Sequence, residues 1–271
     1  MKIASLGSGS KGNATVLRGG ATTLLVDCGF SLREMRKRAP RLDLDLASIT
    51  AILVTHEHGD HCSGVRALAR AYGLPVYLSY GTAGSGRLGD CSDMCRFNAD
   101  AEFSIGDIQI RAVAVPHDAR EPVQYCFEQG GTRVGVLTDL GCITPHVLSA
   151  YAACDLLLLE FNHDPEMLAR GPYPAALKRR VGGDWGHLSN EQALGFLKGI
   201  DTARLQQLVV AHTSAQNNSR ESVESLLHIA FPELLSGLCW AEQEEGFSWL
   251  KVSPGPGSCA ASSAVQLSLQ A

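Results

Sequence analysis

The most informative segment of this 271-residue chain reads Thr55-His56-Glu57-His58-Gly59-Asp60-His61. It follows directly on residues 51–55, a short apolar run typical of a buried strand. We expect His56 and His58, two residues apart, to project to the same side of an extended turn. Asp60 and His61 then lie at the start of the following helix. Imidazole and carboxylate groups clustered at a strand end predict a divalent-metal site.

The composition excludes several classes of protein. Hydrophobic residues make up 45% of the chain, charged residues 19%, and the formal net charge is -5. These values argue against a mainly disordered chain and against a strongly basic protein that coats nucleic acid. No stretch of eighteen apolar residues predicts a membrane span, and the N-terminus lacks the apolar core of a signal peptide. We therefore expect a cytoplasmic protein with no membrane partner.

The cysteines predict reduced thiols. The chain has nine, an odd number, with no C-x-x-C pair. Cys91 and Cys95 are the only close pair, and no second ligand pair at zinc-like spacing lies near them. Ordinary cysteines are favoured over a small structural metal site.

Short apolar runs recur along the chain and predict strands. They are residues 22–26, 51–55, 75–78, 109–115, 123–127, 134–137, 156–159 and 208–211. Helical periodicity follows Asp60 at 61–72, Ser189 at 190–198 and Ser219 at 220–229. We expect neither serine to form a full capping box. The order of hairpins and helices indicates a mixed sheet. With no internal repeat or linker visible, we expect one domain over residues 1–251 and a flexible tail over 252–271.

The segment from His56 to His61 carries the H-x-H-x-D-H signature, and in this the chain resembles the metallo-β-lactamase fold superfamily. The resemblance implies an α/β fold, a four-layer αββα sandwich with two mixed β-sheets. It also implies two divalent metal ions, with zinc or manganese favoured and iron possible, and further ligands at later strand ends. His117, Asp139 and His212 follow the runs 109–115, 134–137 and 208–211 in the expected order.

The resemblance also implies how the seven ligands divide. One metal would be held by His56, His58 and His117. The second would be held by Asp60, His61 and His212, with Asp139 bridging both. Each later residue taken alone is more often a surface histidine or a turn aspartate. The combination with the four-ligand segment is what favours the metal site.

Further blocks narrow the resemblance to the YycJ (WalJ) group of this superfamily. The matching blocks, in chain order, are Ser8-Gly9-Ser10-Lys11-Gly12-Asn13, Pro116-His117-Asp118-Ala119, Glu160-Phe161-Asn162-His163-Asp164, Gly171 to Pro174 with Leu177-Lys178-Arg179-Arg180, and Gly183-Asp184-Trp185-Gly186-His187-Leu188-Ser189-Asn190. The fifth block reads G-D-x-G-H-L-S-N in the group, so Trp185 stands at its variable position. The group is associated with DNA exonuclease-like hydrolysis of phosphodiesters, and the related PhnP group with cyclic phosphodiesters.

These blocks supply the candidates for catalysis and substrate binding. Asp60 and His187 are the candidate catalytic residues: Asp60 would orient the attacking hydroxide, and His187 would donate to a developing oxyanion or a phosphate. The candidate substrate-binding residues are Ser8, Ser10, Asn13, His163, Lys178 and Arg180. For His163 a structural role is slightly favoured. A second basic stretch runs from Arg33 to Arg41. It has two equally favoured interpretations, a set of phosphate contacts or a solvated helix face.

The glycine-rich segment Gly7-x-Gly9-x-x-Gly12 also fits the dinucleotide-binding fingerprint G-x-G-x-x-G. That motif requires a helix next, whose N-terminus receives the pyrophosphate. Here Ala14-Thr15-Val16-Leu17 follows, which is typical of a strand. We therefore expect no nucleotide cofactor.

The leading hypothesis is a dinuclear metal-dependent phosphodiesterase of the DNA exonuclease type, acting on nucleic acid or a small phosphodiester. The alternative is a hydrolase of a small thioester, lactam or cyclic phosphodiester on the same fold. An iron redox enzyme is disfavoured because such members usually carry a fused flavodoxin domain. A non-catalytic binding protein is disfavoured because every ligand is present.

Overall fold

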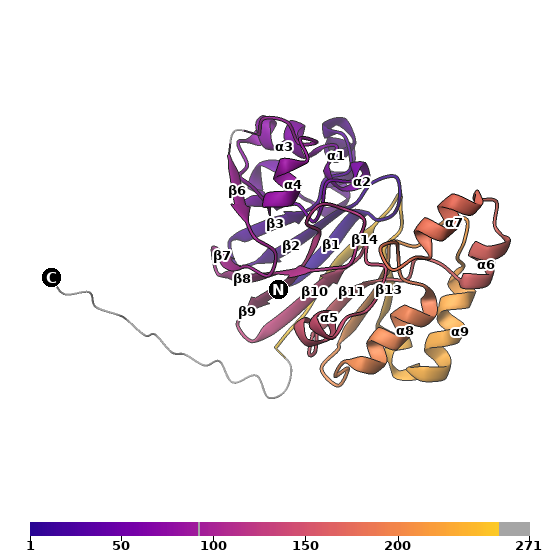
Figure 1. Ribbon diagram of the computed structural model, residues 1–271. Coiled ribbons are helices and arrows are strands. Elements are labelled where there is room, and N and C mark those ends of the chain that lie inside the picture. The colour runs from indigo at the N-terminus through magenta and orange to yellow at the C-terminus, as the bar shows by residue number, and fades with distance from the viewer. Residues whose placement is uncertain (92, 255–271) are drawn as a thin grey trace.

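The computed structural model describes residues 1–91 and 93–254, and they form two mixed β-sheets with helices outside (Figure 1). The first sheet has the strand order β14(Phe247–Lys251), β1(Lys2–Gly7), β2(Ala14–Gly19), β3(Thr22–Val26), β4(Ala51–Leu53), β5(Val76–Ser79), β6(Met94–Phe97). Its strands from β14 to β3 are antiparallel, and those from β3 to β6 are parallel. The glycine-rich segment thus leads into the strand β2, as predicted.

The second sheet has the strand order β13(Leu238–Trp240), β12(Gln207–Ala211), β11(Leu156–Glu160), β10(Thr132–Leu137), β9(Val123–Gln129), β8(Ile108–Ala114), β7(Glu102–Ile105). Strands β10 to β13 are parallel, and β7 to β10 are antiparallel. Both sheets therefore have the same pattern, in which a hairpin run leads into a parallel run. The sequence shows no internal repeat because only the topology is duplicated.

The helices are α1(Leu32–Arg38), α2(Gly59–Cys62), α3(Val65–Tyr72), α4(Tyr80–Gly84), α5(Pro145–Ala150), α6(Pro165–Arg170), α7(Ala175–Val181), α8(Asn190–Gly199) and α9(Arg220–Ala230). Short 3-10 turns lie at Ala39–Leu42, Leu46–Ser48 and Pro232–Gly237. Helices α1 and α3 cover the outer face of the first sheet, and α5, α8 and α9 cover that of the second (Figure 1).

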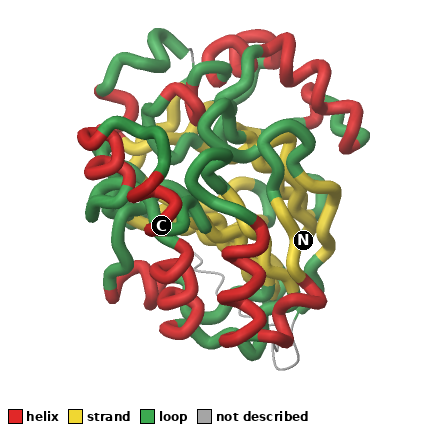
Figure 2. The backbone as a smooth tube through the Cα atoms, turned by 90° about the vertical axis from the view of Figure 1, so that its right-hand side faces the viewer, coloured by secondary structure: helices red, strands yellow, loops and turns green. Residues whose placement is uncertain are grey.

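Strand alternation creates three separate layers of apolar contact. In β3, Leu24 and Val26 face the second sheet, whereas Leu25 faces the helices. In β11, Leu156 and Leu158 face the first sheet, whereas Leu157 and Leu159 face the helices. Strands consequently occupy the interior and helices the two outer sides (Figure 2). The αββα sandwich predicted from the sequence is confirmed.

The predicted elements agree with the structure wherever the apolar pattern was strong. All eight predicted strands are present, with ends shifted by two residues or fewer. The helix predicted over 61–72 is divided into α2 and α3 by Ser63-Gly64, because Gly64 packs its backbone against Phe30 and leaves no room for a Cβ. The expectation that Ser189 lacks a capping box was wrong, since Gln192 completes one at the start of α8.

No helix within the described ranges is long and apolar enough to cross a membrane. The flexible tail predicted over 252–271 lies outside the described residues from 255 onward, so that prediction and the single domain over 1–251 stay predictions.

Candidate metal centre

The candidate ligands meet in a cleft of about 380 Å³ at the ends of the strands. Its lining includes His58, Asp60, Asp139, His187 and His212, which come from four loops far apart in the sequence. The loop after β4 carries the segment from His56 to His61, and the loops after β10 and β12 carry Asp139 and His212. Each residue stands just beyond a rigid strand, which holds its side chain in place.

Three imidazoles form the first group, which consists of His56, His58 and His117. His56 Nε2 lies 3.0 Å from His58 Nδ1, which lies 3.2 Å from His117 Nε2. His56 and His117 are buried, while His58 lines the cleft. Three nitrogens that face one another at this distance are the donor set that zinc, iron or manganese accepts.

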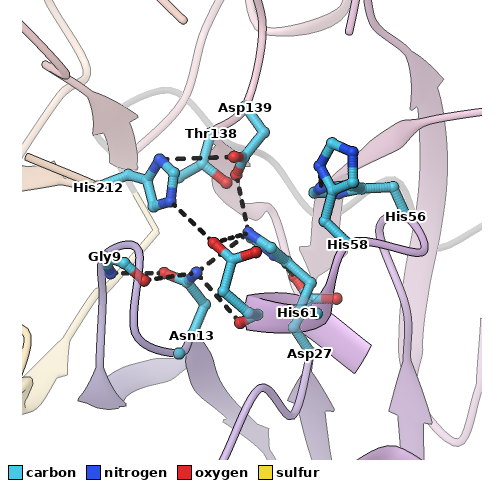
Figure 3. A network of polar contacts seen from close by, with 12 residues as sticks. Gly9, Asn13, Asp27, His56, His58, His61, Thr138, Asp139 and His212 are labelled. Carbon is cyan, nitrogen blue, oxygen red and sulfur yellow. Dashed lines mark hydrogen bonds and ion pairs between the residues drawn. The ribbon is translucent and has the colours of Figure 1, made fainter. Parts of the chain in front are cut away.

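The second group consists of Asp60, His61 and His212, with Asp139 beside it. Asp60 Oδ2 lies 3.5 Å from His61 Nε2 and 3.7 Å from His212 Nε2. Asp139 Oδ2 lies 3.3 Å from His61 Nε2, and Asp139 also joins His56 and His61 in a third ligand group. The side chains of Asp139 and His212 point toward His61 (Figure 3). Asp139 therefore contacts residues of both groups, as expected of a bridging position.

Asp27 orients two of these imidazoles from behind. Its Oδ2 lies 2.8 Å from His61 Nδ1 and accepts the Thr55 hydroxyl at 2.8 Å. Because a carboxylate only accepts, His61 carries its proton on Nδ1. Thr55 Oγ1 in turn lies 2.9 Å from His56 Nδ1 and accepts its proton, since its own hydrogen goes to Asp27. The Nε2 atoms of His56 and His61 thus both face the cluster.

Glu160 does the same on the opposite side of the cleft. Its Oε1 lies 2.9 Å from His212 Nδ1 and 2.8 Å from His187 Nδ1, and its Oε2 accepts from Leu188 N at 2.9 Å. His117 Nδ1 donates to Gly186 O at 3.0 Å. A carboxylate or carbonyl behind each ligating imidazole is the usual device that fixes the tautomer and the ring orientation at a metal.

Burial keeps two imidazoles of the first group, those of His56 and His117, neutral. Burial lowers the pKa of His56 well below its ordinary value, and the neighbouring His61 lowers it further. Burial also lowers the pKa of His117, against the opposing effect of Asp139. Neutral imidazoles keep the lone pairs that a metal requires.

The second group and its neighbour Glu160 contain ionised carboxylates. Burial tends to raise the pKa of Asp139, but His212 and His61 outweigh it and hold that pKa well below the usual range. Burial tends to lower the pKa of His212, but Asp139, Asp60 and Glu160 raise it to about 10. Glu160 is opposed in the same way: burial raises its pKa, and His187 and His212 bring it down to about 2. A divalent cation would neutralise these ionised carboxylates.

Two buried atoms lack hydrogen-bond partners and fit a metal directly. Asp139 Oδ2 and His212 Nε2 are both shielded from solvent and make no hydrogen bond among the described residues. Such groups are costly unless something binds them. Both point into the second group, so the residues present fit the metal ions that the sequence predicts.

Strained backbone concentrates at the same place. Asp27, Asp139 and His212 adopt φ values of 61°, 52° and 52°, a left-handed conformation that is uncommon outside glycine. All three lie directly beyond parallel strands and hold a carboxylate or imidazole of the site. Strain of this kind persists only where surrounding contacts impose it, and it is characteristic of functional sites.

The N-terminal loop mainly supports two of the metal ligands, His61 and His212. Ser8 Oγ accepts from His212 N at 3.1 Å, and Asn13 Nδ2 lies 3.0 Å from His61 Nε2. Asn13 lies between Gly9 and His61 (Figure 3). Of the three polar residues predicted here to bind substrate, Ser10 lines the cleft, whereas Ser8 and Asn13 are buried against ligands.

This loop is braced by the turn between β13 and β14. Gln243 Oε1 accepts from Lys11 N at 2.7 Å, and Gln243 Nε2 donates to Gly12 O at 3.0 Å. Arg38, which is almost buried, donates to the carbonyls of Leu6 and Gln243. Arg38 is therefore committed to this brace and does not serve the phosphate-binding role considered for its stretch.

The remaining predicted substrate contacts separate into two kinds. Arg180 and His187 line the cleft. His163 is buried outside the lining, and Lys178 Nζ donates to Ala169 O. The structure brings Arg180 and His187 to the site but leaves His163 and Lys178 outside it. A bracing role for His163, already favoured by the sequence, accords with this placement.

The sequence reasoning missed Asp27 and Glu160 as site residues. Both are acidic residues at the end of a wholly buried apolar strand, β3 and β11. The same signal had identified Asp139 after β10. Applied to every strand, it would have found all three.

Comparison with known proteins gives consistent matches over most of the chain. The sequence pattern of the "Beta-lactamase superfamily domain" matches residues 22–212. The exodeoxyribonuclease YycJ of Bacillus anthracis is 34% identical over 220 residues, covering 80% of this chain and 83% of the relative. The exodeoxyribonuclease WalJ of Streptococcus pneumoniae is 35% identical over 226 residues, covering 81% and 84%.

A solved structure supports the same fold. The metallo-β-lactamase fold protein YhfI of Bacillus subtilis superposes with a TM-score of 0.69 at 18% identity, covering 92% of this chain and 99% of that one. At this identity the likeness concerns the fold alone.

Proposed function

Since this chain belongs to the metallo-β-lactamase superfamily and to its YycJ-like group, we propose that it is a metal-dependent phosphodiesterase that degrades DNA from an end. The observation that carries the proposal is the pair of ligand groups, His56 with His58 and His117, and Asp60 with His61 and His212. The imidazole nitrogens that converge there, and the Asp139 oxygen that makes no hydrogen bond, favour two divalent ions, zinc or manganese.

Divalent ions held in this geometry supply a nucleophile from water at neutral pH and neutralise charge on the attacked phosphate. The chain's own residues supply the rest. The ionised carboxylate of Asp60 faces the cleft, where it orients the attacking water by accepting a hydrogen bond from it. His187 Nδ1 donates to Glu160. Burial tends to lower the pKa of His187, but Glu160 and Asp139 raise it, so the imidazolium carries a second proton on Nε2 that it donates to a phosphate oxygen in the cleft.

Arg180 supplies positive charge at the rim of the cleft. Its Nε lies 2.5 Å from Asp118 Oδ2, and Asp118 Oδ1 lies 3.5 Å from His117 Nε2. Asp118 therefore holds the guanidinium beside the ligand cluster. An arginine positioned in this way contacts the phosphate next to the one being cleaved.

The decisive experiment is hydrolysis of bis(p-nitrophenyl) phosphate and of a 5′-labelled DNA duplex. Chelated protein is reconstituted separately with zinc and manganese, with His58→Ala as the control. We expect metal-dependent cleavage of both substrates, and loss of metal and activity together in the variant. Full activity of His58→Ala would refute the metal assignment. Two bound metals without phosphodiester cleavage would move the proposal to the thioester or lactam alternative.

His187→Ala separates substrate binding from metal binding. We expect the variant to keep its metal content, measured by elemental analysis, while kcat on bis(p-nitrophenyl) phosphate falls about 10²- to 10³-fold. His146→Ala, an exposed histidine paired with Asp100, serves as the matched control and should retain full activity. Loss of metal from His187→Ala would instead make this residue a brace for the ligands.

A further inference from the structure

Trp185 is the most exposed of the three tryptophans. Its exposed fraction is 63%, whereas Trp240 and Trp249 are half-buried. The indole of Trp240 is covered by the Arg220 guanidinium, and that of Trp249 by two cations at 4.6 and 4.9 Å. No such cover is present over Trp185 among the described residues. A large aromatic surface is thus left open to solvent at one place.

That place is the rim of the metal cleft. Trp185 O accepts from Asp118 N at 3.0 Å, and the next two residues, Gly186 and His187, line the cleft. Gly186 also carries the carbonyl that orients His117. The backbone of Trp185 therefore belongs to the loop that borders the cleft, one residue before the lining residues Gly186 and His187.

The loop that presents Trp185 is rigid. His187 N donates to Val181 O at 2.8 Å, which folds residues 182–187 back onto the end of α7. A Cβ on Gly186 would lie 2.2 Å from the carbonyl oxygen of Val181, and one on Gly141 would lie 2.4 Å from Asp184 O. The backbone of this loop is closely packed on both sides. The loop is therefore already ordered before binding, and a ligand that contacts the indole costs little further conformational entropy.

Positive charge accompanies the aromatic surface. Lys178, Arg179 and Arg180 form the last turn of α7, directly before this loop. Arg180 lines the cleft, and Arg179 is exposed with no ion pair in the part of the chain that the structure describes. Aromatic faces beside a basic track are how proteins bind single-stranded nucleic acid, with bases stacked and phosphates paired.

We propose that Trp185 is the stacking platform for a nucleobase adjacent to the phosphodiester in the cleft, so that the DNA end is unpaired or frayed where it binds. The inference rests on the proposed function, because it assumes that the cleft receives a nucleotide chain. A base within a duplex has both faces covered by its neighbours, and only an unpaired or frayed end offers a face to the indole. The structure thereby adds a base-binding subsite to the metal centre.

Binding to an oligonucleotide with phosphorothioate linkages, which resist hydrolysis, tests the subsite directly. Its dissociation constant is measured by anisotropy for the wild-type protein, Trp185→Ala, Trp185→Phe and Tyr80→Ala. Tyr80 is an aromatic residue of α4 with an exposed fraction of 55%, and, unlike Trp185, it has no chain neighbour in the cleft lining. We expect Trp185→Ala to weaken binding about 5- to 150-fold, Trp185→Phe to restore most of the affinity, and Tyr80→Ala to change nothing.

An abasic nucleotide walked along the oligonucleotide identifies the stacked base. One position should weaken wild-type binding and have no further effect in Trp185→Ala, since both changes remove the same contact. Equal effects in the two proteins at every position, or unchanged binding by Trp185→Ala, would overturn the proposal.

Hydrolysis of bis(p-nitrophenyl) phosphate, which has no base, separates this proposal from the proposed function. Trp185→Ala should retain wild-type kcat on it while KM for single-stranded DNA rises. A parallel loss on both substrates would mean that Trp185 acts through the metal centre, against the proposal. If the wild-type protein hydrolyses neither substrate yet shows base-dependent binding at Trp185, the proposed function fails while the stacking site stands.

Discussion

At the scale of single residues, two buried carboxylates control the orientation of the metal ligands. Asp27 orients His61 directly and His56 through Thr55, while Glu160 orients His212 and His187. The ligands were predictable from the sequence because histidines and aspartates cluster there in a recognisable spacing. The two carboxylates behind them were predictable only as acidic residues at strand ends, since which histidine each one orients depends on the packing of both sheets.

Asp27→Asn tests whether this carboxylate orients the two imidazoles. The amide can still accept one hydrogen bond, but it cannot serve Thr55 and His61 as an ionised acceptor, so both imidazoles lose their fixed tautomers. We expect metal affinity to fall about 10- to 100-fold, measured by competition with a chromophoric chelator. Asp107→Asn, in the exposed turn between β7 and β8, is the control and should bind metal normally. Unchanged affinity of Asp27→Asn would show that the ring orientations come from packing alone.

At the scale of elements, the site is assembled at strand ends that occupy equivalent places in the two sheets. β3 and β10 are each the strand at which antiparallel pairing gives way to parallel pairing, and Asp27 and Asp139 lie just beyond them with similar backbone conformations. The strong apolar runs predicted these strands correctly. The short outer strands β6, β7, β13 and β14 escaped prediction because they are partly exposed and lack the continuous apolar pattern. The buried strand β1 was also missed.

Alanine substitutions at two glycines should have opposite effects on the free energy of unfolding. A Cβ on Gly186 would collide with the carbonyls of Arg180 and Val181, whereas one on Gly195, inside α8, would meet nothing within 4 Å. We expect Gly186→Ala to lower the free energy of unfolding by about 1–3 kcal/mol through this overpacking. Gly195→Ala should raise it by about 0.5–1 kcal/mol, because alanine loses less backbone entropy in a helix. Urea denaturation measures both, and a shift of the same sign in the two variants would contradict the geometry.

At the scale of the whole molecule, the metal centre joins the two halves of the sandwich. The segment from His56 to His61 follows a strand of the first sheet, whereas His117, Asp139 and His212 follow strands of the second. The resemblance predicted the four-layer architecture and the ligand set. It did not predict the brace between the N-terminal loop and Gln243, because that contact spans more than two hundred residues without any local signal.

Removal of the metal should therefore destabilise the entire sandwich. Ions present at about 100 times their dissociation constant stabilise the folded state by about 2.7 kcal/mol. We expect chelation to lower Tm by several degrees, with recovery when zinc or manganese is restored, measured by differential scanning fluorimetry. His58→Ala should show a smaller difference between the chelated and reconstituted samples. The same difference in that variant would place the stabilising ions elsewhere.

The brace formed by Gln243 and Arg38 has a consequence for the timing of biosynthesis. The histidine-rich segment leaves the ribosome early, but the loop beneath His61 and His212 is supported only after residue 243 has been made. At ordinary rates of translation this delay lasts roughly 10 to 40 s. The nascent chain thus exposes a cluster of histidines long before it can enclose a metal in the right geometry, so correct loading belongs to the last stage of folding or follows the release of the chain.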